Sequence, residues 1–353
     1  NAEFNTHALL AHYGEGAKFL QSPFSQFGVK NVFTFFESRG LPLVVEDRKR
    51  AFPHTQRALD VYRVLEKYLK ETNVLVRTGE GVVRVIANGR KVVGVECENV
   101  NYTASSVVLA TGGLSYPKTG STGDGFKWLK NLGHTVKTPT PTIVPLAVYE
   151  PWVKALAGVT LSPAKITFFT DGKKQFSRTG SVLFTHFGIS GPTILNSAGN
   201  VGDMLQAGAV TATIDAFPAL DVGALNARIR SIFDANKNKN LKNIFKDIVP
   251  VGMTGLLASV FNHMDPGTKV HSITKEQRNA IAGTLKALPI TITHLMGFNR
   301  AVVADGGVVL TEIDTKTMRS RLFDNVYVTG DLLHVRRPSG GYSLQLCWTT
   351  GYV

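Results

Sequence analysis

The sequence VVLATGG, at residues 107 to 113, joins a short apolar run to a glycine-rich end, and this combination decides the fold class. Its apolar residues are consecutive rather than alternating, which indicates a parallel strand buried on both faces of a sheet. A second segment of this kind, NVYVTGD, occupies residues 325 to 331. Because open α/β sheets bind ligands at the carboxyl ends of their strands, the two segments together predict a ligand site.

Glycine stands at both strand ends, where its missing Cβ lets a flat or phosphorylated ligand approach the backbone closely. The glycines are Gly112 and Gly113 after the first strand and Gly330 after the second, with Gly340 and Gly341 just beyond. One such end alone is equally well explained by a tight turn with nothing bound. Two of them, about 220 residues apart and in this order, are much less expected by chance.

The rest of the chain divides by its periodicity. Residues 55–71 have the spacing of an amphipathic helix. Residues 74–96 contain short β-rich runs, the first at Val74 to Arg77, with a hairpin signal at Asn88-Gly89. From about residue 145 alternating strands, with a turn at Asp171-Gly172, predict an antiparallel β lobe. Residues 222–288 are helical by period, with Thr274 and Gln277 at capping-box spacing. We therefore predict an α/β domain made of residues 1–143 and 300–353, an inserted β domain of 144–221 and 289–299, and a helical subdomain of 222–288.

Composition limits the class of protein. With 353 residues, 43% of them hydrophobic, the chain has enough apolar material for two or three cores, which excludes a disordered or fibrous protein. No apolar run reaches 18 residues, so we expect no membrane span. Cys97 and Cys347 stand outside any metal-ligand spacing, which favours a reducing compartment, the cytoplasm, and no structural metal.

The chain is strongly basic, with a net charge of +13. Such a charge raises association with nucleic acid through long-range attraction. The cations are spread over the whole length, however, and the densest group, at residues 237–246 (KNKNLKNIFK), has no nucleic-acid motif around it. A solvated surface is therefore the favoured interpretation, and a nucleic-acid partner is not expected.

Several long segments resemble a family of bacterial FAD-dependent oxidoreductases that includes aminoacetone oxidases and flavoproteins of bile-acid dehydroxylation. The resemblance runs from end to end and implies a Rossmann-like fold with FAD as cofactor. Composition and periodicity alone do not point to FAD. The segments that carry the resemblance are EDRKRAFP (46–53), ATGGLSYPKTGSTGDG (110–125), LFTHFGISGP (183–192), ADGGVVLTEIDTKTM (304–318) and VTGDLLHVRRPSGGYSLQLCWTTGYV (328–353).

The resemblance also implies a set of cofactor-binding residues. Asp331 is expected to bind the ribityl or phosphate part of FAD, and Val82 the adenine through its backbone, with Val83 one register away. Thr119 is expected to face the flavin together with Tyr116. The full set is Val82, Ala110, Thr111, Gly112, Gly113, Tyr116, Gly330, Asp331, Gly340, Gly341, Tyr342, Ser343 and Gln345. No catalytic residue is assigned, and His186 is more readily a structural histidine than a ligand.

Two departures from the family pattern stand out. Family members begin with a strand, a GxGxxG-type turn, a helix and a GRCNxTN segment, and Asn1 resembles the last Asn of that segment. We therefore expect roughly 30 to 45 residues, the size of a first βαβ unit, to be missing before it. The second departure is HVRRP, residues 334–338, where the family carries a run such as DVDG. Arg336 and Arg337 either meet an anionic substrate or belong to a charged surface loop.

Three functions remain open. The resemblance implies hydride transfer between flavin and a small organic substrate or NAD(P)H, either as amine oxidation or as reduction of a carbon–carbon double bond. An RNA-associated protein similar to flavoproteins of tRNA modification is the alternative, with residues 237–246 contacting phosphates. The third is a helical interaction scaffold with a vestigial flavin site. The oligomeric state is left open.

Overall fold

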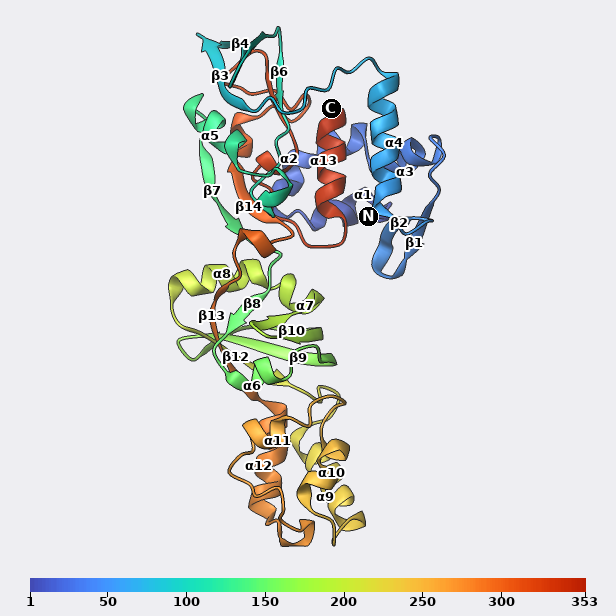
Figure 1. Ribbon diagram of the computed structural model, residues 1–353, viewed down its shortest axis with the longest axis vertical. Helices are drawn as coiled ribbons and strands as arrows, with labels where there is room; N and C mark the ends of the chain where they lie inside the picture. Colours follow the sequence, from blue (N-terminus) through green and yellow to red (C-terminus); the bar gives the residue numbers. More distant parts are fainter. The chain divides into compact units, whose positions relative to one another are not determined.

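The computed structural model describes residues 1–353, which form two compact units (Figure 1). The first unit consists of Asn1–Thr140 and Val302–Val353, and the second consists of Pro141–Ala301. The chain thus leaves the first unit once and returns to it. Within the second unit, the separate β domain and helical subdomain stay predictions.

Helices of the first unit surround a core of side chains from both of its segments. Tyr13 and Leu20 pack there with Leu109, Val328 and Leu346, and each of these five is at most 3% exposed. The helix predicted at residues 55–71 is present from Ala58. The helices are α1 (Thr6–Ala11), α2 (Ala17–Gln26), α3 (Val29–Glu37), α4 (Ala58–Glu71), α5 (Asp124–Asn131) and α13 (Tyr342–Tyr352), with short 3-10 turns at Gly14–Gly16, Asp47–Lys49, Pro117–Thr119, Leu310–Glu312 and Gly330–Leu332.

The strands of the first unit form four small sheets. The antiparallel hairpin predicted by Asn88-Gly89 is present between β3 and β4, but Val74 to Arg77 do not form a strand. The sheets are β1 (Leu43–Glu46) with β2 (Arg50–Pro53), β3 (Val82–Asn88) with β4 (Lys91–Cys97) and β5 (Asn101–Thr103), β7 (Val136–Pro141) with β14 (Ala304–Val308), and β6 (Val107–Leu109) with β15 (Val326–Val328).

One expectation about β6 is wrong. The apolar run predicted a strand buried on both faces, whereas Val108 is 59% exposed and only Leu109 of the strand is buried. The physical reason is that β6 pairs with β15 alone, in a parallel two-stranded sheet. A two-stranded sheet leaves one face of each strand uncovered unless other elements pack on it.

The second unit contains a closed antiparallel barrel. Its strand order is β10-β11-β8-β13-β12-β9, so the predicted antiparallel pairing is correct, although the sequence did not predict closure. The turn between β9 and β10 contains Asp171 and Gly172, with φ of 48° and 76°, as a two-residue hairpin turn requires. The strands are β8 (Leu146–Val148), β9 (Thr160–Thr170), β10 (Lys173–Thr185), β11 (Gly188–Ser190), β12 (Val210–Asp215) and β13 (Leu288–Leu295).

Helices of the second unit share one continuous apolar core with the barrel. The predicted capping box is present, because Gln277 N donates to Thr274 Oγ1 (3.2 Å) and Thr274 N donates to Gln277 Oε1 (2.9 Å). Ile281 and Leu285 of that helix are fully buried. The helices are α6 (Pro151–Ala155), α7 (Pro192–Leu195), α8 (Ala198–Ala207), α9 (Val222–Ala235), α10 (Leu241–Ile248), α11 (Leu256–Ser259) and α12 (Lys275–Lys286), with 3-10 turns at Val270–Ser272 and Phe298–Arg300. None of the chain's helices combines the length and apolar character that crossing a membrane requires.

Candidate nucleotide-binding site

The two glycine-rich strand ends lie side by side. β6 and β15 run parallel with Leu109 opposite Val328, and Thr329 N donates to the Leu109 carbonyl at 3.1 Å. The two strands therefore end at the same edge of the sheet. A Cβ added to Gly113 would lie 3.4 Å from both the Cβ and the backbone oxygen of Asp331, so the backbone of the first strand end passes directly beside Asp331 at the second.

Gly330 is needed where the second strand end meets helix α13. Its φ is +62°, and an added Cβ would lie 3.2 Å from Cys347 Sγ on that helix. Its N–H donates to Thr350 Oγ1 at 2.9 Å, which fixes the turn to the same helix. Glycine at this position therefore serves helix packing, whether or not a ligand also approaches it.

The start of helix α13 is held in place by residues from the N-terminal segment. Tyr13 is fully buried, and its hydroxyl donates to the Tyr342 carbonyl at 2.9 Å. Asn1 Nδ2 donates to the Gly340 carbonyl at 3.0 Å, and Gly341 precedes the helix in a left-handed conformation. The first N–H groups of any α-helix lack acceptors within the helix, so this fixed end suits an electron-rich or anionic group.

Only one of the two carboxylate oxygens of Asp331 accepts hydrogen bonds from the protein. Its Oδ1 accepts hydrogen bonds from Arg337 Nη2 and, at 3.7 Å, from the Cys347 thiol, whereas no hydrogen bond within the protein reaches Oδ2. The side chain is 17% exposed. Burial first, and the nearby Asp331 charge second, raise the pKa of Cys347 to about 12. The thiol is therefore protonated and unreactive at neutral pH.

The two arginines of the HVRRP segment have different surroundings. Arg337 has a side chain only 1% exposed, so its interpretation as part of a charged surface loop is wrong. Arg336 Nε lies 3.2 Å from Asp305 Oδ2, and its side chain is 57% exposed. Each arginine is thus paired with an aspartate, Asp305 from β14 and Asp331 from the end of β15.

The other predicted cofactor-binding residues near the strand ends make no hydrogen bond to Asp331. Tyr116 is half exposed, and Thr119 Oγ1 donates to its carbonyl at 2.9 Å, but no hydrogen bond or ring contact joins Tyr116 to Asp331 or helix α13. Thr111 Oγ1 lies within 3.4 Å of the Gly112 carbonyl. Gln345 is fully buried and its Oε1 accepts no hydrogen bond. A buried acceptor of this kind is unfavourable until some donor satisfies it.

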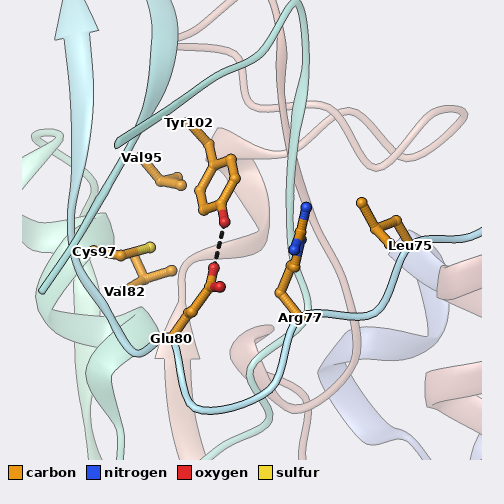
Figure 2. Close-up of a pocket in the computed structure, with 7 residues that line it drawn as sticks. All are labelled: Leu75, Arg77, Glu80, Val82, Val95, Cys97 and Tyr102. Atoms are coloured by element: carbon orange, nitrogen blue, oxygen red, sulfur yellow. Dashed lines mark hydrogen bonds between the residues drawn. The ribbon is translucent and has the colours of Figure 1, made fainter. Parts of the chain in front are cut away.

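A separate cavity of about 350 Å³ adjoins Val82 (Figure 2). Across it, the Tyr102 hydroxyl donates to Glu80 Oε2, and this bond raises the pKa of Tyr102. The Val83 carbonyl is occupied, since it accepts from Trp128 Nε1 at 3.1 Å. Of the two registers considered, Val82 lines the cavity and Val83 does not, and the adenine contact itself stays a prediction. The lining residues, most of them not singled out from the sequence, are Leu75, Arg77, Glu80, Val82, Val95, Cys97 and Tyr102.

His134, Glu312 and Ser320 form a hydrogen-bonded row that the sequence did not reveal. His134 Nδ1 lies 2.7 Å from Glu312 Oε2, and His134 Nε2 lies 2.9 Å from Ser320 Oγ. The order resembles a hydrolase triad, but Ser320 is 2% exposed and its Oγ also accepts from the backbone N–H groups of Leu322 and Phe323. The row therefore joins three segments of the first unit and presents no nucleophile.

His186 lies in the second unit, between β10 and β11. It is exposed, and its ring contacts Phe187 at a centroid distance of 4.9 Å. The Arg300 guanidinium lies over the same Phe187 ring at 4.4 Å. Both interpretations of His186, as a structural residue and as a ligand-site candidate, therefore stay predictions.

Paired parallel strands with glycine-rich ends, next to a helix start, are the kind of arrangement at which Rossmann-type proteins bind dinucleotides. The sequence matches the family described as HI0933-like protein Rossmann domain over residues 1–353. The chain belongs to this family, which is a family of flavoproteins. The α/β fold class predicted from the sequence is thereby confirmed.

The curated proteins similar to the chain include the following three. The 3-dehydro-bile acid delta(4,6)-reductase of Clostridium scindens is 27% identical over 344 residues, which cover 97% of this chain and 83% of the relative. The ribosomal RNA dihydrouridine synthase of Escherichia coli is 28% identical, over 70% of this chain and 58% of its own length. The enzyme of the same name from Haemophilus influenzae is 28% identical, over 79% of this chain and 67% of its own length. The aminoacetone-oxidase part of the resemblance stays a prediction.

Proposed function

We propose that the protein is an FAD-dependent oxidoreductase that reduces a carbon–carbon double bond in a small organic substrate. The observation that carries this proposal is the approach of Gly113 to Asp331 at the shared end of β6 and β15. Close backbone approach beside an ionised acceptor is what a dinucleotide cofactor with hydroxyl groups needs. Membership of a flavoprotein family supports FAD as that cofactor.

The residues at the site fit FAD. Asp331 Oδ2 would accept a hydrogen bond from a ribityl hydroxyl, and the N–H groups at Tyr342 and Ser343 would face an electron-rich ring edge. The cavity beside Val82 would take the adenine, with the Val82 backbone as its hydrogen-bonding partner. When bound, FAD would supply hydride transfer from a donor to one carbon of the double bond, the other carbon taking a proton from solvent, and protein side chains alone do not supply this hydride chemistry.

The names of the relatives favour reduction over oxidation. A delta(4,6)-reductase and a dihydrouridine synthase both, by name, add hydrogen to carbon–carbon double bonds. The substrates in the two names, a bile acid and a ribosomal RNA, differ in size and charge, but the same kind of bond is reduced in both. For this chain we infer the same reaction class, with NADH or NADPH as the source of the hydride.

The test is spectroscopic. The purified protein should show the absorbance bands of an oxidised flavin, and anaerobic addition of NADH or NADPH should bleach them. Subsequent addition of a conjugated enone, such as a 3-oxo-4,6-diene steroid, should restore the bands as the enone is reduced. A colourless protein would contradict FAD binding. Bleaching by a primary amine, with no response to enones, would instead favour the oxidase interpretation.

A nucleic-acid substrate is the second candidate. Two relatives are ribosomal RNA dihydrouridine synthases, and the net charge of this chain is +13. Lys237, Lys239, Lys242 and Lys246 are all exposed, at the end of α9 and along α10. If RNA is the substrate, incubation of ribosomal RNA with the protein and NADPH should yield dihydrouridine, detected by mass spectrometry. A charge-reversing Lys242→Glu and Lys246→Glu variant should then bind RNA more weakly. Retention of RNA binding by this variant would exclude α10 as the contact surface.

A further inference from the structure

Arg337 is the one buried cation of the chain. None of the other lysine and arginine residues is buried, whereas the Arg337 side chain is 1% exposed. Each nitrogen of its guanidinium donates one hydrogen bond: Nε to Ser343 Oγ at 2.7 Å, Nη1 to the Val335 carbonyl at 2.6 Å, and Nη2 to Asp331 Oδ1. Because the guanidinium is planar, three fixed partners determine its orientation.

This arrangement determines which atom of Asp331 is available. Arg337 and the Cys347 thiol both donate to Oδ1, so the carboxylate is held by one oxygen and the other, Oδ2, has no partner in the protein. The pair also neutralises the Asp331 charge. An unpaired carboxylate at this position would repel an anionic group such as a pyrophosphate, whereas the paired one does so much less.

Ser343 links this pair to helix α13. The hydroxyl of Ser343, in the first turn of the helix, accepts the Arg337 Nε hydrogen bond, and Val335 belongs to the segment that joins β15 to the helix. Arg337 therefore fixes the end of β15 and the start of α13 relative to each other. These are the two elements that the proposed function places against FAD.

We propose that Arg337 is a positioning residue for the cofactor: it holds Asp331 so that Oδ2 is the oxygen offered to a ligand hydroxyl. The inference rests on the proposed function, because the ligand is FAD. It also argues against Arg337 as a contact for an anionic substrate, since its side chain is 1% exposed and each of its three nitrogens already donates a hydrogen bond inside the protein. Arg337 touches no substrate and acts through Asp331.

The test is a double-mutant cycle with the dissociation constant of FAD as its readout, measured by quenching of FAD fluorescence. We expect Arg337→Met to weaken FAD binding about tenfold or more, the size of one charge-assisted hydrogen bond. In an Asp331→Asn background, the same change should alter binding by less than about twofold, because an amide nitrogen already replaces the Oδ2 acceptor that Arg337 positions for the ligand. Arg337→Lys keeps the charge without the planar fork and should give an intermediate value.

The variants also separate positioning from folding. Arg337→Met leaves Asp331 without its partner and can destabilise the protein, whereas the Arg337→Met, Asp331→Asn double variant removes both charges and should fold. Arg336→Met is the matched control, since it breaks the neighbouring pair with Asp305 and should leave the FAD dissociation constant unchanged. Melting temperatures of the ligand-free variants show any loss of stability apart from the loss of affinity.

Each outcome decides between explanations. Equal losses of affinity from Arg337→Met in both backgrounds would overturn the inference, because Arg337 would then act independently of Asp331. An unchanged FAD dissociation constant in Arg337→Met, with FAD bound by the wild-type protein, would overturn the inference and leave the proposed function standing. Absence of FAD binding by the wild-type protein would overturn both.

Discussion

Replacement of Asp331 is the most informative perturbation of the proposed site, since it has two separable effects. The first is on FAD affinity. Loss of the Oδ2 acceptor removes one charge-assisted hydrogen bond, about 1.5 to 3 kcal/mol, which corresponds to roughly a 10- to 100-fold weaker dissociation constant. We expect this loss in both Asp331→Ala and Asp331→Asn.

The second effect is on the stability of the ligand-free protein, and it differs between the two variants. In Asp331→Ala, the buried Arg337 guanidinium keeps Ser343 and Val335 but loses its counter-ion. Breaking a buried ion pair in this way costs about 3 to 5 kcal/mol, and we expect the lower end because Asp331 is 17% exposed. Asp331→Asn retains an oxygen acceptor for Arg337, so its stability loss should be smaller.

FAD titration by fluorescence and urea unfolding of the ligand-free protein measure the two effects separately. If Asp331 binds the cofactor, Asp331→Asn should lose affinity while it stays close to wild type in its unfolding midpoint. The reasoning is refuted if both variants bind FAD like the wild-type protein and differ only in stability. Asp331 would then be the counter-ion of Arg337 and nothing more.

Three further predictions concern particular residues. Burial raises the pKa of Glu312, but hydrogen bonds from Thr135 and His134 outweigh it, so the net pKa is lowered. The contribution of ionised Glu312 to the free energy of unfolding is therefore present above its unfolded pKa and is lost as pH falls through the lower folded value. Urea unfolding of Glu312→Gln at pH 7 and pH 3 should show less pH dependence than wild type, and equal dependence would contradict this. A Cβ at Gly94 would lie 2.0 Å from the Tyr102 carbonyl, so Gly94→Ala should lower the unfolding free energy by more than about 2 kcal/mol; an unchanged urea midpoint would show that the β4–β5 pairing is wrong. Gly113→Ala should fold normally, since its nearest contact is 3.4 Å, but should bind FAD more weakly by fluorescence titration, and wild-type affinity would argue against close cofactor approach there.

Several features of the fold depend on neighbours in the sequence, and these were predicted. The Asp171-Gly172 turn and the Thr274 capping box follow from the conformations and side chains of residues at most three positions apart. Two apolar runs with similar ends also predicted that the ends of β6 and β15 share one site, whereas the direct parallel pairing of these two strands was found only in the structure. The exposure of Val108 was missed, because an apolar run does not reveal how many strands or helices cover it.

The sequence by itself determined the class of the site: two strand ends with glycine, an aspartate after the second, and a glycine pair before a helix. These are local patterns, and local sterics govern them. Only the tertiary structure decided the partners of the charged and polar groups. His134 meets Ser320 across 186 positions, the barrel closes through β8 and β13, and Arg337 is buried on Asp331 rather than placed in a surface loop. The physical reason is that a buried polar group must find a partner wherever packing brings one, and packing depends on the whole unit at once.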